Sequence, residues 1–427
     1  MGKARQVAKN SYLQLRKYAP GLMDGLCAVW KKIEGPRESL GDMEDFVRQV
    51  RANHAAIQVA ESYASVMNRK PSREADLCHL DIAFLVPEPI RGSGGHRNIY
   101  RAVSQLRAFG HHLTVYYMQT QRPAAKVKQQ VSAWFYDMGD IPFLCYEGEL
   151  GYHDVVVATW WETVYLIEEN REKVRYPFYF TQDFEAYFYP MSTDYILAEN
   201  TYRMGYPCIC SGPWMSTLIR EKYHGNAAHF QFPVDRSIYH TKVPRTKKNS
   251  NVVFFAKPDM PRRCYALGIQ ALKEFHTLRP EVEIILFGSE RIEGKNLPFP
   301  ATVKKLLPTL DDLADLYRNA DLGMVFSTTN PSLVPYEMLS CDCPVVDLDL
   351  EFAEAKYGNS RENVFLLSPI PEQMGKQMAA LFDTPQELRD CAARGKAWVA
   401  DEFPSEEEMA RRVEELILRN IKGQAKQ

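Results

Sequence analysis

The stretch STTNPSLVPYEMLSCDCPVVDLD, residues 327–349, decides the fold of this chain. Its polar, Pro-containing start predicts a loop, the following PYEML predicts a short helix that carries Glu337, and PVVD predicts a buried strand over residues 344–347. An apolar run at residues 322–326 predicts another strand just before the loop. A strand, a loop and a helix in this order indicate a βα unit of an α/β sheet.

The loop and the start of the helix also predict a binding site. Free backbone N–H groups and a partial positive charge meet at a helix N-terminus, and this geometry binds phosphate. Ser332 and Leu333 supply the backbone at this point. The carboxylate of Glu337 only accepts hydrogen bonds and can take two hydroxyl groups of a ribose. The stretch therefore predicts a site for a nucleotide.

The same stretch resembles the second half-site of retaining nucleotide-sugar glycosyltransferases with two Rossmann-like domains, the GT-B architecture. Their pattern is E-x7-E followed by a small residue, Cys, Gly, x, Pro and two valines; MLSCDCPVV matches its end and Glu337 its second Glu. The chain departs from the pattern at Thr329, in place of the first Glu, and at Asp342, in place of Gly. The departure at Thr329 is similar to a bacterial branch of rhamnosyltransferases that use dTDP-rhamnose. The resemblance covers roughly residues 80–400.

Composition describes an ordinary globular protein. The chain has 427 residues, enough for two domains, with 45% hydrophobic residues and a formal net charge of −2. This charge gives no reason to expect a nucleic-acid partner, and no run approaches the ~18 apolar residues of a membrane span. The nine cysteines lack a regular framework, which favours a reducing cytoplasm. The two C-x-C pairs are interpreted as core thiols rather than zinc ligands.

Residues 1–75 are predicted to form a separate helical segment. Apolar residues recur at helical spacing between Leu22 and Ile33, and Asp42 is a suitable N-cap for a second helix. The first twenty residues contain basic residues and no acidic residue. Two interpretations remain open, with the first favoured. The helices pack on the catalytic body or on another glycan-assembly protein, or their basic surface contacts anionic lipid headgroups of the inner membrane.

The first Rossmann-like domain is predicted over residues 76–240. A strand at 82–86, a Gly-rich loop, a helix at 97–109 and a strand at 113–118 form a βαβ unit. The loop lacks the third glycine of a dinucleotide fingerprint, because that position is Arg97. Gly94 and Gly95 still allow close approach of a bound group, with a simple tight turn as the alternative. By resemblance the loop faces the donor's phosphate–sugar end, and His96 and Arg97 are assigned to the acceptor.

Further strands and helices alternate as far as a helix that begins at Pro213, which requires a parallel, doubly wound sheet. Two polar segments follow strands of this sheet, where functional residues gather. Aromatic faces beside a carboxylate suit a sugar acceptor, and a carboxylate can serve as acid or base. Buried tryptophans and a helix cap are the alternatives. The predicted acceptor residues are Trp160, Trp161, Glu162 and Gln182, and the predicted catalytic carboxylates are Asp183 and Glu185.

The second Rossmann-like domain is predicted over residues 241–400. Lys257 and Arg263 keep the six-residue spacing of the basic pair that holds the donor diphosphate in the resembling family. A nucleotide diphosphate that leaves without a metal needs such fixed cations, so the pair is assigned to donor binding and catalysis. The resemblance also implies that a helix within residues 401–427 packs back onto the first domain.

No metal and no cofactor are predicted. The DLD sequence at residues 347–349 imitates an Asp-x-Asp metal motif, but it follows a buried β-run and is interpreted as a strand end. The resemblance implies an enzyme that moves rhamnose from dTDP-L-rhamnose onto a glycan or lipid-linked glycan. The expected location is the cytoplasm, with peripheral contact at the cytoplasmic face of the membrane as the alternative. The alternatives are the same fold with a UDP- or GDP-hexose donor, a non-catalytic scaffold and, least favoured, a dehydrogenase.

Overall fold

The computed structural model describes residues 74–118, 122–242, 250–350 and 353–424. All of them belong to one compact unit, residues 53–427. The predicted helices of the N-terminal segment lie outside the described residues. Among the helices that are described, none is both long and apolar enough to cross a membrane.

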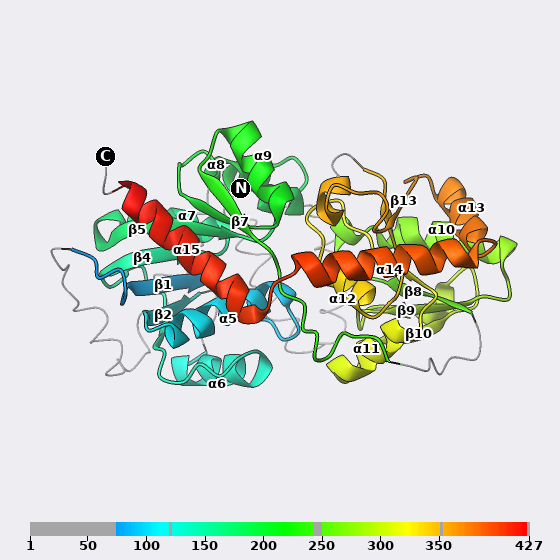
Figure 1. Cartoon of the computed structure of the whole chain (residues 1–427). Helices are drawn as coiled ribbons and strands as arrows, with labels where there is room; N and C mark the ends of the chain where they lie inside the picture. Colours follow the sequence, from blue (N-terminus) through cyan, green and yellow to red (C-terminus); the bar gives the residue numbers. More distant parts are fainter. Residues whose placement is uncertain (1–73, 119–121, 243–249, 351–352, 425–427) are drawn as a thin grey trace, which may run out of the picture. The chain divides into compact units, whose positions relative to one another are not determined.

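The first sheet has seven parallel strands in the order β3-β2-β1-β4-β5-β6-β7 (Figure 1). The strands are β1 (Asp81–Val86), β2 (His112–Tyr117), β3 (Phe143–Cys145), β4 (His153–Ala158), β5 (Val174–Thr181), β6 (Cys208–Ser211) and β7 (Ala227–Phe230). The accompanying helices are α5 (Gly94–Ala108), α6 (Ala124–Trp134), α7 (Trp161–Glu169), α8 (Thr193–Thr201) and α9 (Pro213–Tyr223), with 3₁₀ turns at Arg171–Lys173 and Glu185–Phe188.

The second sheet has six parallel strands in the order β10-β9-β8-β11-β12-β13. The strands are β8 (Asn251–Phe255), β9 (Glu283–Phe287), β10 (Thr302–Lys305), β11 (Leu322–Met324), β12 (Val345–Leu348) and β13 (Phe365–Leu367). The helices are α10 (Tyr265–Leu278), α11 (Leu310–Arg318), α12 (Val334–Ser340), α13 (Pro371–Leu381) and α14 (Pro385–Glu402), with 3₁₀ turns at Pro261–Arg263, Gly294–Asn296 and Ala353–Tyr357.

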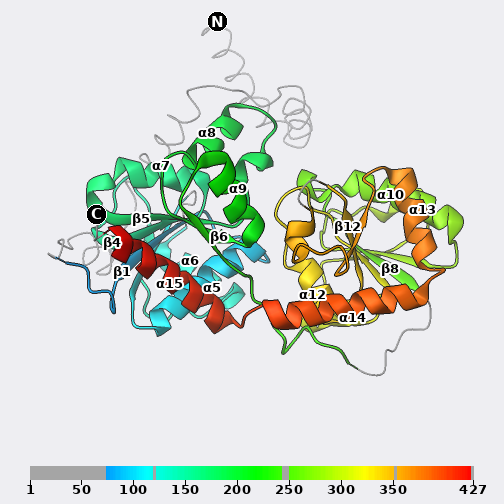
Figure 2. The same ribbon diagram turned by 45° about the horizontal axis from the view of Figure 1, so that its top comes forward.

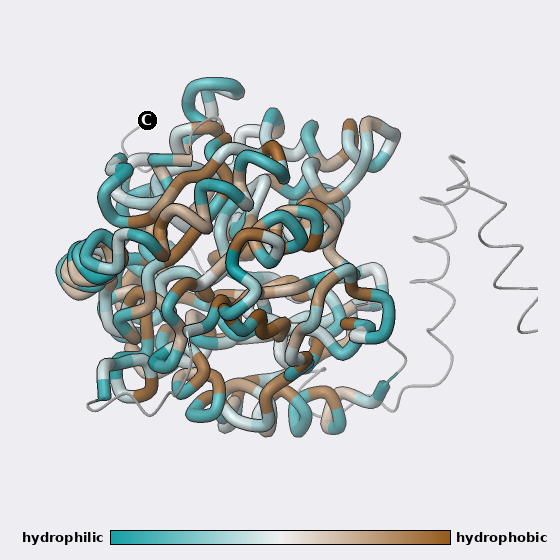
Figure 3. The backbone as a smooth tube through the Cα atoms, turned by 90° about the vertical axis from the view of Figure 1, so that its right-hand side faces the viewer, coloured by the Kyte–Doolittle hydropathy of each residue, from teal (hydrophilic) through white to brown (hydrophobic). Residues whose placement is uncertain are grey.

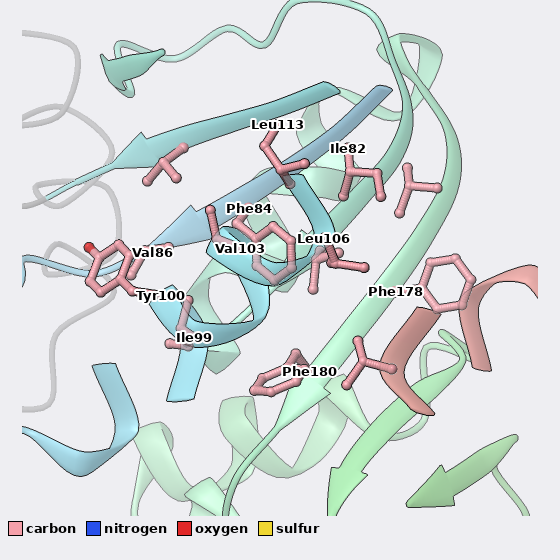
Figure 4. Packing of buried hydrophobic residues seen from close by; sticks show 14 of the residues in the cluster. Ile82, Phe84, Val86, Ile99, Tyr100, Val103, Leu106, Leu113, Phe178 and Phe180 are labelled. Atoms are coloured by element: carbon pink, nitrogen blue, oxygen red, sulfur yellow. The ribbon is translucent and has the colours of Figure 1, made fainter. Parts of the chain in front are cut away.

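These strands form because their side chains are apolar on both faces. All six residues of β4 are buried, as expected when helices cover both sides of a parallel sheet. On β1, Ile82 and Phe84 belong to the same core cluster as Val103 and Leu106 of α5 (Figure 4). The surrounding helices instead alternate between hydrophobic and hydrophilic segments along their turns (Figure 3).

The last helix, α15 (Glu406–Gln424), returns to the first sheet after the second is complete. It packs against α5 and β7, whereas α14 packs against α12 (Figures 1 and 2). The apolar residues of α15 recur at helical spacing and join the first core: Met409, Val413, Leu416, Ile417 and Ile421. The predicted boundary at 240/241 falls between β7 and β8, and that at 400/401 falls in the last turn of α14.

The predicted architecture of two doubly wound parallel-sheet domains is confirmed. Arg262 and Arg263 precede the helix α10. They lie in a 3₁₀ turn, and Cys264, with a φ of +48°, separates this turn from α10. The strands β3, β7 and β10 were not predicted; each lies at a sheet edge and is only three or four residues long, too short for a clear pattern.

We predict that Gly375→Ala destabilises the second domain by about 1–3 kcal/mol, because the helices α10 and α13 touch there. An added Cβ at Gly375 would lie 2.7 Å from the Ala271 carbonyl oxygen and 2.9 Å from the Phe275 nitrogen. Gly423→Ala in α15 is the matched control, since no atom lies within 4 Å of its added Cβ. Chemical denaturation should show a loss of stability for the first variant alone, and equal stabilities would contradict this account of the packing.

Candidate functional site

Each sheet reverses its strand order once, and ligands of doubly wound sheets bind outside the carboxyl ends of the strands at such a point. In the first sheet the reversal lies between β1 and β4, and in the second between β8 and β11. Gly94 and Gly95 form the start of α5, after the loop that follows β1, and Trp160 lies two residues after β4. Lys257 lies two residues after β8, and the loop with Thr329 follows β11.

Three cations gather after β8. Lys257 donates a hydrogen bond from Nζ to the Gly288 carbonyl oxygen at 2.7 Å. Arg263 is buried and donates from Nη1 to the Phe326 carbonyl oxygen at 3.4 Å. Arg262 lies between them and the first sheet, with Nε 3.7 Å from Oδ2 of Asp183. Carbonyl oxygens thus orient Lys257 and Arg263, and neither forms an ion pair of 4.0 Å or less with another residue that the structure describes.

The electrostatics of this cluster favour an added anion. Burial, together with the neighbouring Arg262, lowers the pKa of Arg263 to about 10, and Asp183 and Asp347 oppose the change. The pKa of Lys257 is also lowered, first by burial and then by the two arginines, against the opposing effect of Asp259.

Three buried polar atoms at this place make no hydrogen bond within the described part of the chain. They are Nε of Arg262, Nε of Arg263 and Oγ of Ser332. Buried donors are costly to leave unpaired, so such a group of donors fits a ligand with several acceptor oxygens. The neighbouring Leu333 is half-buried and packs against core residues of both sheets.

Asp347 fixes the loop that borders the basic cluster. It is fully buried and accepts hydrogen bonds from the Ser327 nitrogen and the Tyr357 hydroxyl group, at 3.2 and 2.9 Å. Lys356 donates to the Ser327 carbonyl oxygen at 2.7 Å and lies 3.9 Å from Asp347. Asp347 is therefore an internal anchor of the loop. Among the described residues, no three His, Cys, Asp or Glu side chains are grouped so that they could hold a metal ion.

Glu337 lies on α12, half-buried, beside residues of the first domain. Burial raises its pKa to about 7, although Arg97, the Tyr239 hydroxyl group and Arg101 favour its charged form. Arg97 is half-buried, with its guanidinium group 5.9 Å from the ring centre of Tyr136. The structure thus brings Glu337 and Arg97, predicted on opposite sides of the site, to one place.

The two glycines at the start of α5 leave space for a ligand beside the backbone. A Cβ added to Gly94 would meet no atom within 4 Å, and one added to Gly95 would meet only Gln182 and Ser93 at 3.5 Å or more. Packing does not require glycine at Gly94, so a close approach by a ligand is the better explanation for a residue without a side chain. Ser93 caps the helix and bonds the ring of His96 at 2.9 Å.

His96 differs from its assigned role. It is buried, with its ring stacked near those of Tyr100 and Phe135. Burial also lowers its pKa. In this position the His96 ring packs inside the first domain, and its Nε2 has no hydrogen-bond partner among the described residues.

The residues after β4 fall into two groups. Trp161 is buried, and its Nε1 donates to the Tyr189 hydroxyl group at 3.0 Å, so it packs inside the domain. Trp160 and Glu162 are half-buried, and the ring of Trp160 stacks on Phe188 with centres 5.7 Å apart. Of the two predicted tryptophans, only Trp160 retains surface for a sugar.

Glu185 is also enclosed. It accepts hydrogen bonds from the Trp161 nitrogen at 2.5 Å and the Tyr179 hydroxyl group at 2.8 Å, and its own nitrogen donates to Tyr202 at 3.0 Å. Burial raises its pKa to about 8, against the effect of these two hydrogen bonds to its carboxyl group. The geometry makes Glu185 a support for the loop that carries the tryptophans rather than a group in contact with substrate.

Gln182 and Asp183 join parts of the site that the sequence left separate. Gln182 donates to the Gly95 carbonyl oxygen at 3.0 Å. Asp183 is buried and accepts hydrogen bonds from Thr329 and Asn330 of the second domain, at 2.8 and 3.0 Å. Sequence reasoning missed Arg262, Asn330 and the anchoring role of Asp347. Adjacency to Arg263 was a signal for Arg262, whereas nothing local marks Asn330.

We predict that Glu185→Gln flattens the dependence of stability on pH. The unfolded chain ionises this carboxyl group above its ordinary pKa near 4.5, whereas the folded protein keeps it protonated up to about 8. Stability of the wild type should therefore fall relative to the variant as pH rises from 5 to 8, by on the order of 4 kcal/mol. Unfolding midpoints measured across this range test it, and parallel curves for both proteins would contradict it.

Two family descriptions match the chain. The N-terminal domain of WsaF matches residues 147–211, and the C-terminal domain of WsaF matches residues 250–379. The first range contains Trp160 and Asp183, and the second contains the basic cluster and Glu337. An O-antigen biosynthesis protein, RfbC, from Myxococcus xanthus is 31% identical over 200 residues. The match covers 46% of this chain and 16% of that protein, so the chain spans only about a sixth of its relative.

Solved structures share the fold. TarM has a TM-score of 0.63 at 8% identity, over 80% of this chain and 99% of its own. Sucrose-phosphate synthase from Thermosynechococcus elongatus has a TM-score of 0.57 at 13% identity, and the match covers 80% of this chain and 100% of that protein. Anabaena HepE, in complex with UDP-glucose, has a TM-score of 0.57 at 14% identity, and the match covers 81% of this chain and 100% of that protein. These structures show that the two parallel-sheet domains of this chain have the GT-B architecture.

Proposed function

We propose that the chain is a glycosyltransferase of surface-glycan synthesis that binds a nucleoside-diphosphate sugar at Lys257, Arg262 and Arg263. The observation that carries the proposal is the buried Arg263 beside the half-buried Lys257 and Arg262, because Nε of Arg263 has no hydrogen-bond partner among the described residues. A diphosphate supplies both the negative charge and the acceptor oxygens that this group lacks. The matches to both WsaF domains and to an O-antigen biosynthesis protein support the reaction class.

The proposed chemistry uses the cluster as the partner of the leaving group. When the bond between sugar and phosphate breaks, negative charge grows on the diphosphate, and fixed cations stabilise that charge without a metal ion. Glu337 accepts the ribose hydroxyl groups, and Gly94 and Gly95 border the reacting sugar. Retention of configuration is proposed, with a donor phosphate oxygen taking the acceptor's proton.

The acceptor is proposed to be a glycan or lipid-linked glycan that binds between Arg97 and Trp160, with Glu162 beside them. These three side chains are half-buried and therefore present partial surface. His96, Trp161 and Glu185 are not included because the protein encloses them. Aromatic faces and charged groups at one site are suited to sugar rings and their hydroxyl groups.

The donor is proposed to be dTDP-L-rhamnose, on the strength of Thr329. The hydroxyl group of Thr329 bonds Asp183, so the donor sugar meets no glutamate side chain there. A donor with a 6-hydroxyl group would gain from a full E-x7-E pattern, whereas a 6-deoxy sugar does not need it. A UDP-hexose is the second candidate, because the similar fold of HepE is known with UDP-glucose.

We predict that dTDP raises the melting temperature of the protein without Mg²⁺, because a ligand that binds only the folded state stabilises it. Lys257→Ala and Arg263→Ala should each weaken binding by about 10- to 100-fold, as expected for lost hydrogen bonds to a charged group. Lys273→Ala, on an exposed part of α10, is the matched control.

A thermal-shift panel of dTDP, UDP, GDP and ADP checks this prediction. A rise in melting temperature with UDP alone would contradict the proposed dTDP donor but agree with the proposed site. Equal shifts in wild type and in both cluster variants would contradict the site, and no shift with any nucleotide would favour the scaffold alternative.

We also predict that dTDP affinity rises with pH through about 7, because Glu337 accepts hydroxyl groups best when ionised and its pKa is raised to about 7. Glu337→Gln should remove this part of the pH dependence. The phosphate of dTDP titrates in the same range, so calorimetric titrations must compare wild type and variant at each pH. Identical pH profiles would exclude Glu337 from the ribose site.

A further inference from the structure

We propose that seven residues form a clasp between the two domains, and that Asp183 acts there as a positioning residue. The clasp comprises Gln182, Asp183, Phe188 and Ser211 of the first domain and Arg262, Thr329 and Asn330 of the second. It holds the loop after β11 against the carboxyl ends of β5 and β6. The two halves of the site are thereby assembled independently of any bound nucleotide.

Asp183 is the centre of the clasp. Its Oδ1 accepts hydrogen bonds from the backbone nitrogens of Phe184 and Asn330, at 2.9 and 3.0 Å. Its Oδ2 accepts from the Thr329 hydroxyl group at 2.8 Å and faces Nε of Arg262 at 3.7 Å. Both oxygens are thus occupied by protein donors, and the residue is buried. A carboxylate so fully engaged suits positioning better than proton transfer to a substrate.

Asn330 completes the hydrogen bonds. Its side-chain nitrogen donates to the Gln182 carbonyl oxygen at 2.8 Å, to Oγ of Ser211 at 2.8 Å and to the Ser211 carbonyl oxygen at 3.1 Å. The Ser211 hydroxyl group in turn donates to the Gln182 carbonyl oxygen at 2.8 Å. Asn330 is 6% exposed. Hydrogen bonds in such a dry place are strong, and breaking one leaves its partner unsatisfied.

A cation–π contact adds to the clasp. The guanidinium group of Arg262 lies over the ring of Phe188, 4.3 Å from its centre. The ring of Phe188 also stacks on Trp160, so an aromatic pair of the first domain meets an arginine of the second. Such contacts are stronger where water is excluded.

The clasp reaches both half-sites. Gln182 bonds the Gly95 carbonyl oxygen and accepts from Asn98, which fixes the glycine-rich loop at one end. Arg262 is adjacent to Arg263 and lowers the pKa of Lys257, which places the other end at the basic cluster. Movement of the clasp would therefore change the separation between donor and acceptor groups.

Thr329 gives the clasp its specific residue requirement. The E-x7-E pattern would place a carboxylate at Thr329, but here a carboxylate already arrives from the other domain. Two buried carboxylates at this distance would repel each other unless one were protonated. We therefore expect Thr329→Glu to open the clasp, and Asp183→Asn to relieve that effect in the double variant.

Hydrogen exchange of the full chain, read by mass spectrometry, tests the clasp without any substrate. In the wild type the Asn330 amide, bonded to Asp183, should be protected. Asp183→Ala and Asn330→Ala should each raise exchange in residues 327–333 about tenfold or more, as expected for a lost buried hydrogen bond. Asp183→Asn keeps an acceptor and should raise it less. Asp140→Ala, which removes an exposed carboxylate, is the control.

Unchanged exchange in residues 327–333 of Asp183→Ala would overturn the proposal. So would a uniform rise over the whole chain, because it would show general destabilisation rather than a local contact. Thr329→Val, which removes one hydroxyl group, is a milder variant if Asp183→Ala does not fold. The result does not depend on nucleotide binding, so the clasp and the proposed function can fail separately.

Discussion

Three neighbouring cations, with Arg263 buried and Lys257 and Arg262 half-buried, are the constraint on which the site depends. Lys257 and Arg263 are oriented by carbonyl oxygens, and burial lowers the pKa of both. Like charges about 4 Å apart repel each other by on the order of a few kcal/mol at the effective dielectric constant of a protein surface. The sheet supports this arrangement from below, through buried Asp347 and Lys356. The arrangement is understandable if a ligand with two or more negative charges completes it.

The position of the cluster follows from the topology. Parallel strands that are buried on both faces direct their carboxyl ends to one edge, and the reversal of strand order opens a place between two neighbouring loops. Because both sheets have the same order of strands, each provides one such place. The hydrogen bonds of Asp183 and Asn330 join the two places. The fold therefore determines where each half of the site lies, and a few buried polar residues fix the two halves relative to each other.

The sequence allowed prediction of whatever depends on local pattern. Apolar runs with β-branched residues located most strands, and the spacing of Lys257 and Arg263 located the basic cluster. Roles that depend on partners far away in the sequence could not be predicted from local pattern. His96 and Glu185 are polar residues at functional positions, but aromatic neighbours and a Trp161 backbone bond enclose them. Asn330 binds Ser211, 119 residues away, and no local signal marks such a pair.

The most direct measurement is a crystal structure of the full chain with dTDP. Our account predicts that the diphosphate lies within hydrogen-bonding distance of Lys257, Arg263 and Ser332, with the ribose hydroxyl groups toward Glu337. The unpaired nitrogens of the arginines would then have partners. A nucleotide bound elsewhere, with the basic cluster unchanged, would contradict the central claim that these cations form the donor site.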